Sequence, residues 1–260
     1  MSEYPEGHHP VFFLINALKA LGAEAIFVRD ERTLNCWGME VNGKLFVWLV
    51  DNRLDHEKLH EDPAAAELMR RGVVVASAQR PDAERTGTRW LPLAASPGYR
   101  PPDKPVEKLF DISFTGYIRD EGRAQALGHL ARHFSVSISQ GVFGDSAVSN
   151  YWQGRVGFNI SMGLPGPTAY DVPMRVTEVM ATGTPLVTNY LPELDMMGIK
   201  GGSHCVTYSD LDEMIAVVRY MVDRPDEARE MGEYAAEEIA AHHTYRRRAE
   251  KVLSWLDGKE

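Results

Sequence analysis

Short apolar stretches alternate with helix-forming segments through the second half of the chain, and this alternation predicts a parallel β-sheet with helices on both faces. The expected strands are Asp111–Thr115, Phe134–Ile138, Val156–Ile160, Pro185–Thr188 and Cys205–Tyr208. The expected helices between them are Glu121–Arg132 and Met174–Thr182. Three more helices should close the chain, because apolar residues recur there at helical spacing. We interpret those apolar stripes as core.

The segment from Pro92 to Pro105 interrupts this pattern, since its prolines and Gly98 exclude both a regular helix and a central strand. We interpret it as the hinge between two lobes. The expected division is a first lobe over residues 1–100, a second lobe over 101–244, and a final helix over 245–260 that packs back toward the first lobe.

The first lobe begins with a helix rather than a strand. Apolar residues from Val11 to Leu21 fall at helical spacing, Gly22 ends that helix, and Ala25–Val28 reads as a short strand. Two further stretches, Asn35–Val41 and Lys44–Val50, flank Asn42-Gly43, which is the strongest short-range signal for a β-hairpin.

Composition limits the function classes. The net charge of −9 argues against a broad phosphate-binding surface of the kind that drives non-specific nucleic-acid binding. No apolar run approaches the roughly 18 residues that span a bilayer, and the amino terminus lacks a signal-peptide pattern, which predicts a cytoplasmic protein. Cys36 and Cys205 have no zinc-ligand spacing, and no His, Asp and Glu cluster indicates a metal site.

Two positions in the second lobe could bind a phosphorylated ligand, because anions bind where parallel strands end and helices begin. In the first, a strand runs into Gly116, with Arg119 and Arg123 beside the next helix; an ordinary strand–helix loop is the alternative. In the second, Arg175 and Glu178 lie three residues apart on one helix face. That carboxylate could accept both hydroxyls of a ribose, or it could simply pair with Arg175.

Several short motifs in this order resemble GT-B glycosyltransferases. The run DVPMRVTEVMATGTPLVTN is similar to their nucleotide-sugar signature, in particular that of the spore-maturation (CgeB-like) group within the group 1 glycosyl transferases. The other motifs are VWLVDN, TRWLPLAASPGYRP, DISFTGYIRDEGR, VGFNIS and HHTYRRRAEKVLSWL. The match runs from about Lys44 to Leu256. It implies an α/β fold with two Rossmann-like lobes and parallel sheets. The first is the acceptor-side lobe, trimmed because a full lobe of this family opens with a strand, and the second is the nucleotide-sugar-binding lobe. The resemblance also implies no bound metal, no cofactor, and a nucleotide-sugar co-substrate of the UDP type.

The resemblance also assigns roles to residues. Glu178 matches the acid that holds the donor ribose, Gly116 the glycine of the phosphate loop, and Arg119 or Arg123 its basic residue, while Arg175 would lie beside the diphosphate. Related retaining enzymes carry a second acid eight residues earlier, but here that place is Tyr170, with Asp171 next to it. This departure leaves the stereochemistry open. The expected donor-binding set is completed by Tyr117, Tyr170, Asp171 and Thr184.

The catalytic candidates lie in the first lobe. Asp51 directly follows the second hairpin strand, at an end that should face the cleft, so it could act as the base or contact the acceptor hydroxyl. Its alternative role is to cap the following loop. His8 and His9, before the first helix, are the other candidates, and either could be solvated or cap that helix.

The sequence therefore predicts a glycosyltransferase that moves a sugar to a hydroxyl acceptor. That acceptor could be a glycan, a protein, a metabolite or a hydroxymethylated base in phage DNA. A non-catalytic nucleotide-sugar or glycan-binding module with a degenerate GT-B fold is the main alternative. An epimerase-like protein is a third reading, but the chain lacks the G-x-G-x-x-G turn of a dinucleotide binder.

Overall fold

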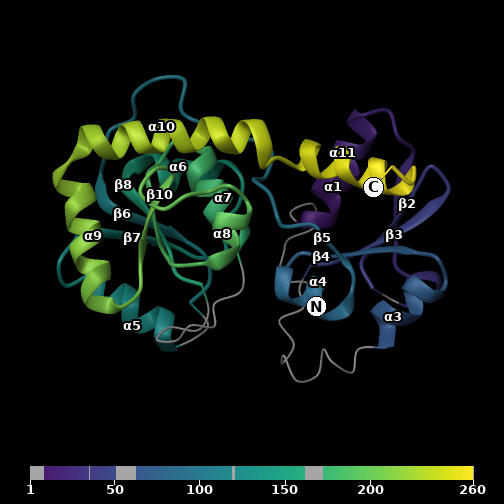
Figure 1. Ribbon diagram of the computed structural model, residues 1–260. Coiled ribbons are helices and arrows are strands. Elements are labelled where there is room, and N and C mark those ends of the chain that lie inside the picture. The colour runs from purple at the N-terminus through teal and green to yellow at the C-terminus, as the bar shows by residue number, and fades with distance from the viewer. Residues whose placement is uncertain (1–8, 35, 51–62, 119–120, 162–171, 260) are drawn as a thin grey trace. The chain divides into compact units, whose positions relative to one another are not determined.

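The computed structural model describes residues 9–34, 36–50, 63–118, 121–161 and 172–259. The chain forms two compact units, which Figure 1 shows. The first comprises Met1–Ala94 together with Thr244–Glu260, and the second comprises Ala95–His243. The chain thus passes between the units at 94/95 and again at 243/244, and helix α11 (Tyr245–Leu256) belongs to the first unit.

The first unit contains a five-stranded sheet in the order β1-β2-β3-β4-β5. Its strands are β1 (Ala25–Val28), β2 (Gly38–Val41), β3 (Lys44–Leu49), β4 (Val74–Ser77) and β5 (Arg89–Trp90). The sheet is parallel from β3 to β5, but β2 runs antiparallel to both β1 and β3. The expectation of a parallel sheet thus needs correction here, because the hairpin at Asn42 and Gly43, with φ of 49° and 75°, reverses the chain.

Helices cover both faces of this sheet. Helix α3 (Pro63–Arg70) packs Leu68 against Val47 and Val75 in one apolar cluster. Helices α1 (Pro10–Ala20) and α11 pack against each other. The Trp255 ring of α11 lies 6.5 Å from that of Phe46 in β3, so α11 shares a core with the sheet. The short helix α4 (Arg80–Thr86) joins β4 to β5.

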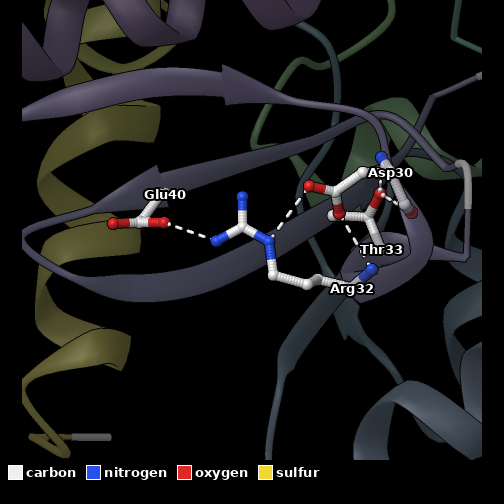
Figure 2. A network of polar contacts seen from close by, with 4 residues as sticks. All are labelled: Asp30, Arg32, Thr33 and Glu40. Carbon is white, nitrogen blue, oxygen red and sulfur yellow. Dashed lines mark hydrogen bonds and ion pairs between the residues drawn. The ribbon is translucent and has the colours of Figure 1, made fainter.

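The connection from β1 to β2 is fixed by the polar network in Figure 2. A 3-10 turn (Glu31–Thr33) is capped by Asp30, whose carboxylate accepts from the Arg32 amide at 2.8 Å. The Arg32 guanidinium donates to Asp30 at 3.0 Å and to Glu40 of β2 at 2.9 Å. This exposed network contributes little to stability but holds the turn across two strands.

The second unit contains a five-stranded sheet in the order β10-β9-β8-β6-β7, and every pairing in it is parallel. Its strands are β6 (Phe110–Thr115), β7 (Val136–Ser139), β8 (Gly154–Asn159), β9 (Leu186–Asn189) and β10 (Cys205–Tyr208). Its helices are α5 (Glu121–Leu130), α6 (Asp145–Gln153), α7 (Met174–Ala181), α8 (Pro192–Met196), α9 (Leu211–Asp223) and α10 (Pro225–His242). The predicted alternation of strands and helices is confirmed.

Two apolar clusters show which helices share each face of this sheet. Helices α5 and α9, with Ala228 from the start of α10, share a cluster with Phe114 of β6 and Phe158 of β8. Helices α6, α7, α8 and α10 share the other cluster with Leu186 and Cys205. Figure 1 shows these helices around the sheet. This doubly wound arrangement leaves the carboxyl ends of the strands as the edge at which loops meet helix N-termini.

None of the described helices combines the length and the apolarity that crossing a membrane requires.

Candidate functional site

The strand order of the second unit reverses beside β6. The chain passes from β6 to β7 on one side and then returns to β8 on the other. In doubly wound sheets, ligands bind in the crevice at such a reversal, outside the carboxyl ends of the strands. The residues that follow Thr115 of β6 and Asn159 of β8 therefore mark the candidate site.

Arg175, in the first turn of α7, joins the ends of these two strands. Its Nε donates to the carbonyl of Thr115 at 2.5 Å, and its Nη1 donates to Oδ1 of Asn159 at 2.8 Å. Its guanidinium also lies over the Phe114 ring, 4.6 Å from the centroid. These contacts set a positive charge in one orientation at the reversal point, beside the N-terminus of a helix.

Gly116 makes room for that arginine. Its φ is 151°, and a Cβ at this position would lie 2.9 Å from Cζ of Arg175, which is closer than real Cβ contacts come. The Gly116 amide donates to the carbonyl of Ser139 at 2.9 Å. Gly116 therefore serves the site by admitting Arg175, whereas the sequence predicted that it lets the backbone approach a phosphate.

Arg123 proves to be a buried arginine that ties two loops together. Its Nη1 donates to the Tyr117 carbonyl at 2.6 Å and its Nη2 to the Ile160 carbonyl at 3.2 Å. These carbonyls follow β6 and β8, where the sheet no longer supplies donors. The interpretation of Arg123 as a phosphate ligand is thus corrected to that of a loop-positioning residue. The Tyr117 hydroxyl points toward Gly141, after β7.

Glu178 lies one turn after Arg175 and is 8% exposed. Its Oε1 accepts a hydrogen bond of 2.6 Å from the hydroxyl of Ser96. Burial raises the pKa of Glu178 to about 7, although the Ser96 hydrogen bond and the charge of Arg175 act in the opposite direction. A carboxylate that is nearly buried and close to an arginine is typical of a ligand-binding group.

A polar network that the sequence analysis did not single out supports the ends of β8 and β9. Asn159 Nδ2 donates to Ser161 at 3.2 Å and to Thr188 at 2.9 Å, while Asn189 Oδ1 accepts from the Ser161 amide at 2.8 Å. The available signal was an asparagine at the last position of each of two neighbouring strands. This network orients Asn159, and through it Arg175.

Thr184 does not join the site. Its buried hydroxyl donates to the carbonyl of Tyr151 at 3.1 Å, and it precedes β9. It therefore lies at the amino end of that strand, whereas Arg175 and Gly116 lie at carboxyl ends. The prediction that Thr184 binds the donor is corrected, because a residue just before a parallel strand is on the opposite edge of the sheet.

His9, in the first unit, caps a helix. Its Nδ1 accepts from the Val11 amide at 3.3 Å, and its ring stacks on Trp37 with centroids 4.0 Å apart. Burial and the charge of Arg29 lower its pKa to about 4, so the imidazole is neutral near pH 7. Because Nδ1 accepts, the proton is on Nε2, and His9 cannot act as a base without losing its cap. The interpretation of His9 as a catalytic base is corrected accordingly.

Five predicted site residues lie outside the described residues: His8, Asp51, Arg119, Tyr170 and Asp171. Within the described part of the chain, no group of three or more His, Cys, Asp and Glu side chains is placed to hold a metal ion. The described site therefore consists of Arg175, Glu178, Gly116 and the side chains that orient them.

Residues 103–254, more than half of the chain, match the protein family described as glycosyl transferase-like. Sequence comparison with curated proteins gives no match. Among solved structures, sucrose-phosphate synthase from Thermosynechococcus elongatus is similar, with 11% identity and a TM-score of 0.55 over 79% of this chain and 62% of that chain. HepE from Anabaena, solved in complex with UDP and glucose, has 9% identity and a TM-score of 0.63 over 82% of this chain and 71% of that one.

A third similar structure is TarM from S. aureus, with 12% identity and a TM-score of 0.55 over 80% of this chain and 50% of that one. At such identities the likeness shows the fold alone, and that fold is the predicted GT-B arrangement. The chain spans 62%, 71% and 50% of the lengths of these three proteins, so it is shorter than each.

Proposed function

The chain belongs to the glycosyl transferase-like family, and from this premise we propose that it transfers a sugar from a nucleotide-diphosphate donor to a hydroxyl acceptor. We propose a UDP-sugar as the donor and the second unit as its binding site. The observation that carries the proposal is the placement of Arg175 across the ends of β6 and β8, one helical turn from the buried Glu178. HepE, which shares the fold, was solved with UDP and glucose.

In this proposal, Glu178 accepts hydrogen bonds from the ribose hydroxyls, and Arg175 lies beside the diphosphate. Transfer breaks the bond between the anomeric carbon and the phosphate oxygen, which leaves negative charge on the departing diphosphate. The Arg175 guanidinium and the amides in the first turn of α7 stabilise that charge. Arg119 joins the donor site by resemblance, and Tyr117, Tyr170 and Asp171 are proposed to complete it from their places beside Gly116 and before α7 in the sequence.

The acceptor oxygen attacks the anomeric carbon and must lose its proton. Asp51, which follows β3 by two residues in the sequence, is our proposed base, and that position in the sequence is the support for its role. The acceptor is a hydroxyl of a glycan, a protein, a metabolite or a hydroxymethylated DNA base. The order of the motifs supports placing the chain in the CgeB-like group, and we propose that transfer needs no metal.

Donor binding by Glu178→Ala tests the proposal. Isothermal titration with UDP-glucose should show affinity weakened by about 1.5–3 kcal/mol, the usual loss for a charge-assisted hydrogen bond. Glu233→Ala is a matched control, because that carboxylate is exposed on α10 and pairs only with Arg229 among the described contacts. Unchanged affinity in a folded Glu178→Ala protein would remove the assignment.

Hydrolysis of the donor without acceptor separates an enzyme from a binding module. A transferase releases some sugar to water, whereas a module that only binds the nucleotide sugar leaves it intact. A panel of nucleotide sugars screened by thermal shift comes first, because a ligand at about 100 times its dissociation constant adds roughly 2.7 kcal/mol of stability.

A further inference from the structure

Ser96 is the second residue of the second unit, in a segment whose backbone is held in place. The Ala95 amide donates to the carbonyl of His243 at 3.0 Å, which ties together the two chain segments at the border of this unit. The Tyr99 amide donates to the Ser96 carbonyl at 3.3 Å. The hydroxyl of Ser96 therefore extends from a fixed point.

That hydroxyl meets Glu178 across 82 positions of sequence. The two side chains are joined by a hydrogen bond of 2.6 Å from Oγ to Oε1, and both residues are less than 9% exposed. Among the described contacts of Glu178, the hydrogen bond engages Oε1 and leaves Oε2 for a ligand. A single donor from the linking segment thus sets the rotation of the carboxylate.

Within the part of the chain that the structure describes, few other groups stabilise the Glu178 carboxylate. Arg175 on the same helix is the cation that acts on it, and the Tyr99 and Tyr151 phenols lie close enough that Glu178 raises their pKa values, after burial, which is the larger cause. Helix α10 contributes apolar residues, Ala235 and Ile239, to the cluster around α7. Since burial raises the pKa of Glu178, the Ser96 hydrogen bond matters for keeping it ionised.

We infer that Ser96 is a positioning residue for the nucleotide site: its hydroxyl orients the Glu178 carboxylate so that Oε2 can accept from a ribose. The inference rests on the proposed function and adds to it a residue from the segment that links the two units. Ser96 acts through Glu178, and no contact between Ser96 and the nucleotide is required.

The consequence is a change in the pH dependence of donor binding. In the wild type, affinity for a UDP-sugar rises as Glu178 ionises. Ser96→Ala removes a donor that favours the carboxylate, so the pKa of Glu178 rises and the same gain in affinity needs a higher pH. We expect the midpoint to move up by about one pH unit, and the affinity near pH 7 to fall about 5- to 10-fold, the size typical of one hydrogen bond to a charged group.

The experiment is isothermal titration of the full chain with UDP-glucose from pH 5.5 to pH 9. UDP-glucose is preferred to UDP because its diphosphate is esterified at both ends and has no ionisation in this range. Ser96→Thr keeps the hydroxyl and should restore the wild-type profile. Ser113→Ala is the matched control, because this serine is also buried in the second unit but its hydroxyl donates to the Val156 carbonyl within the sheet.

A Ser96→Ala protein with the wild-type affinity and pH profile would overturn the inference, and so would a Ser113→Ala protein with the same shift as Ser96→Ala. These results differ from a failure of the proposed function. If Glu178→Ala binds UDP-glucose as the wild type does, or if the wild type does not bind it, the donor site itself is wrong. Glu178→Ala should bind weakly at every pH, with a flat profile.

Discussion

The sheets of the two units differ in what lies at the carboxyl ends of their strands. In the second unit, five parallel strands bring Arg175, Glu178 and a network of asparagines to their carboxyl ends. In the first unit, the antiparallel β2 interrupts the sheet, and Trp37, stacked on His9, lies just before it. Since Gly38 pairs with Val28 at the end of β1, this aromatic pair lies at the carboxyl end of that strand.

This difference predicts which substitutions should affect donor binding and which should affect turnover. A parallel sheet aligns strand ends and helix N-termini, so it can hold a charged ligand such as a diphosphate at fixed positions. The described edge of the first unit offers aromatic packing and a neutral histidine instead. Changes at Glu178 and Gly116 in the second unit should therefore affect donor affinity, changes at Arg175 should also slow transfer, and changes in the first unit should affect turnover alone.

The largest expected effect is on turnover, from Asp51→Asn. If Asp51 is the base, the change should lower turnover by roughly 10²–10⁴-fold and leave donor affinity nearly intact, because it removes proton transfer and keeps the shape of the side chain. Initial rates at saturating UDP-sugar, together with titration of the donor, measure both quantities on one protein.

The melting temperature of Asp51→Asn provides the control. If Asp51 only caps the following loop, the variant should melt earlier, and turnover per folded molecule should not change. A stable and fully active variant would exclude both roles. The proposal that the first unit supplies the base would then have no support from His9, because the described geometry of His9 does not suit a base.

The next effect is on donor affinity, from Gly116→Ala. A side chain at φ 151° is strained, and its Cβ would displace the Arg175 guanidinium, so affinity for UDP-glucose should fall by about 10- to 100-fold. Gly128→Ala is the control, because Gly128 lies within α5 with nothing in reach of a Cβ. That variant should gain about 0.5–1 kcal/mol of stability and bind normally. Equal affinity of both variants would contradict the role of Gly116.

Sequence patterns predicted the second unit better than the first, for physical reasons. In each unit one strand was predicted to the residue, Cys205–Tyr208 in the second and Ala25–Val28 in the first. Both are short apolar runs between residues that interrupt regular structure, and such runs define strands. The two-residue strand β5 and the helix α3 were not predicted. Neither has enough residues to establish a period, and their structure depends on packing against β4.

The site was predictable in part. Arg175 and Glu178 follow from helical spacing and a family resemblance, but their partners do not. Ser96 contacts Glu178 only when the linking segment folds onto α7, and no local sequence pattern predicts such a contact. Arg123 shows the opposite case: its place in the first turn of α5 suggested a phosphate ligand, yet the carbonyls after β6 and β8 take its donors.

A smaller effect concerns stability and pH, and it tests the burial of Glu178. Its folded pKa of about 7 exceeds the ordinary value of 4.5, so the folded state holds a proton that the unfolded state has lost between these values. This contribution to stability is complete below pH 4.5 and is lost as the pH rises to about 7. Glu178→Gln has no such loss, and relative to the wild type it should gain at most about 3 kcal/mol between pH 4.5 and pH 8.

Urea unfolding of both proteins at pH 4.5 and at pH 8 measures this difference. A gap between the two proteins that is the same at both pH values would show that Glu178 ionises in the folded state as it does in the unfolded chain. The matched change Glu233→Gln, on the exposed face of α10, should leave the pH dependence as in the wild type.

The smallest expected effect is that of chelation, which should leave transfer unchanged. The departing diphosphate needs positive charge, and the second unit supplies it from Arg175 and from the start of α7, where aligned peptide dipoles act as about half a positive charge. Rates measured with EDTA should therefore equal those without it, whereas Arg175→Gln should slow transfer with or without EDTA. If EDTA abolished transfer and Mg²⁺ restored it, stabilisation of the leaving group would depend on a metal ion. The positive charge of the second unit would then not be enough. An Arg175→Gln variant of undiminished rate would point to the same conclusion from the protein side, because the fixed guanidinium between β6 and β8 would then have no part in the reaction.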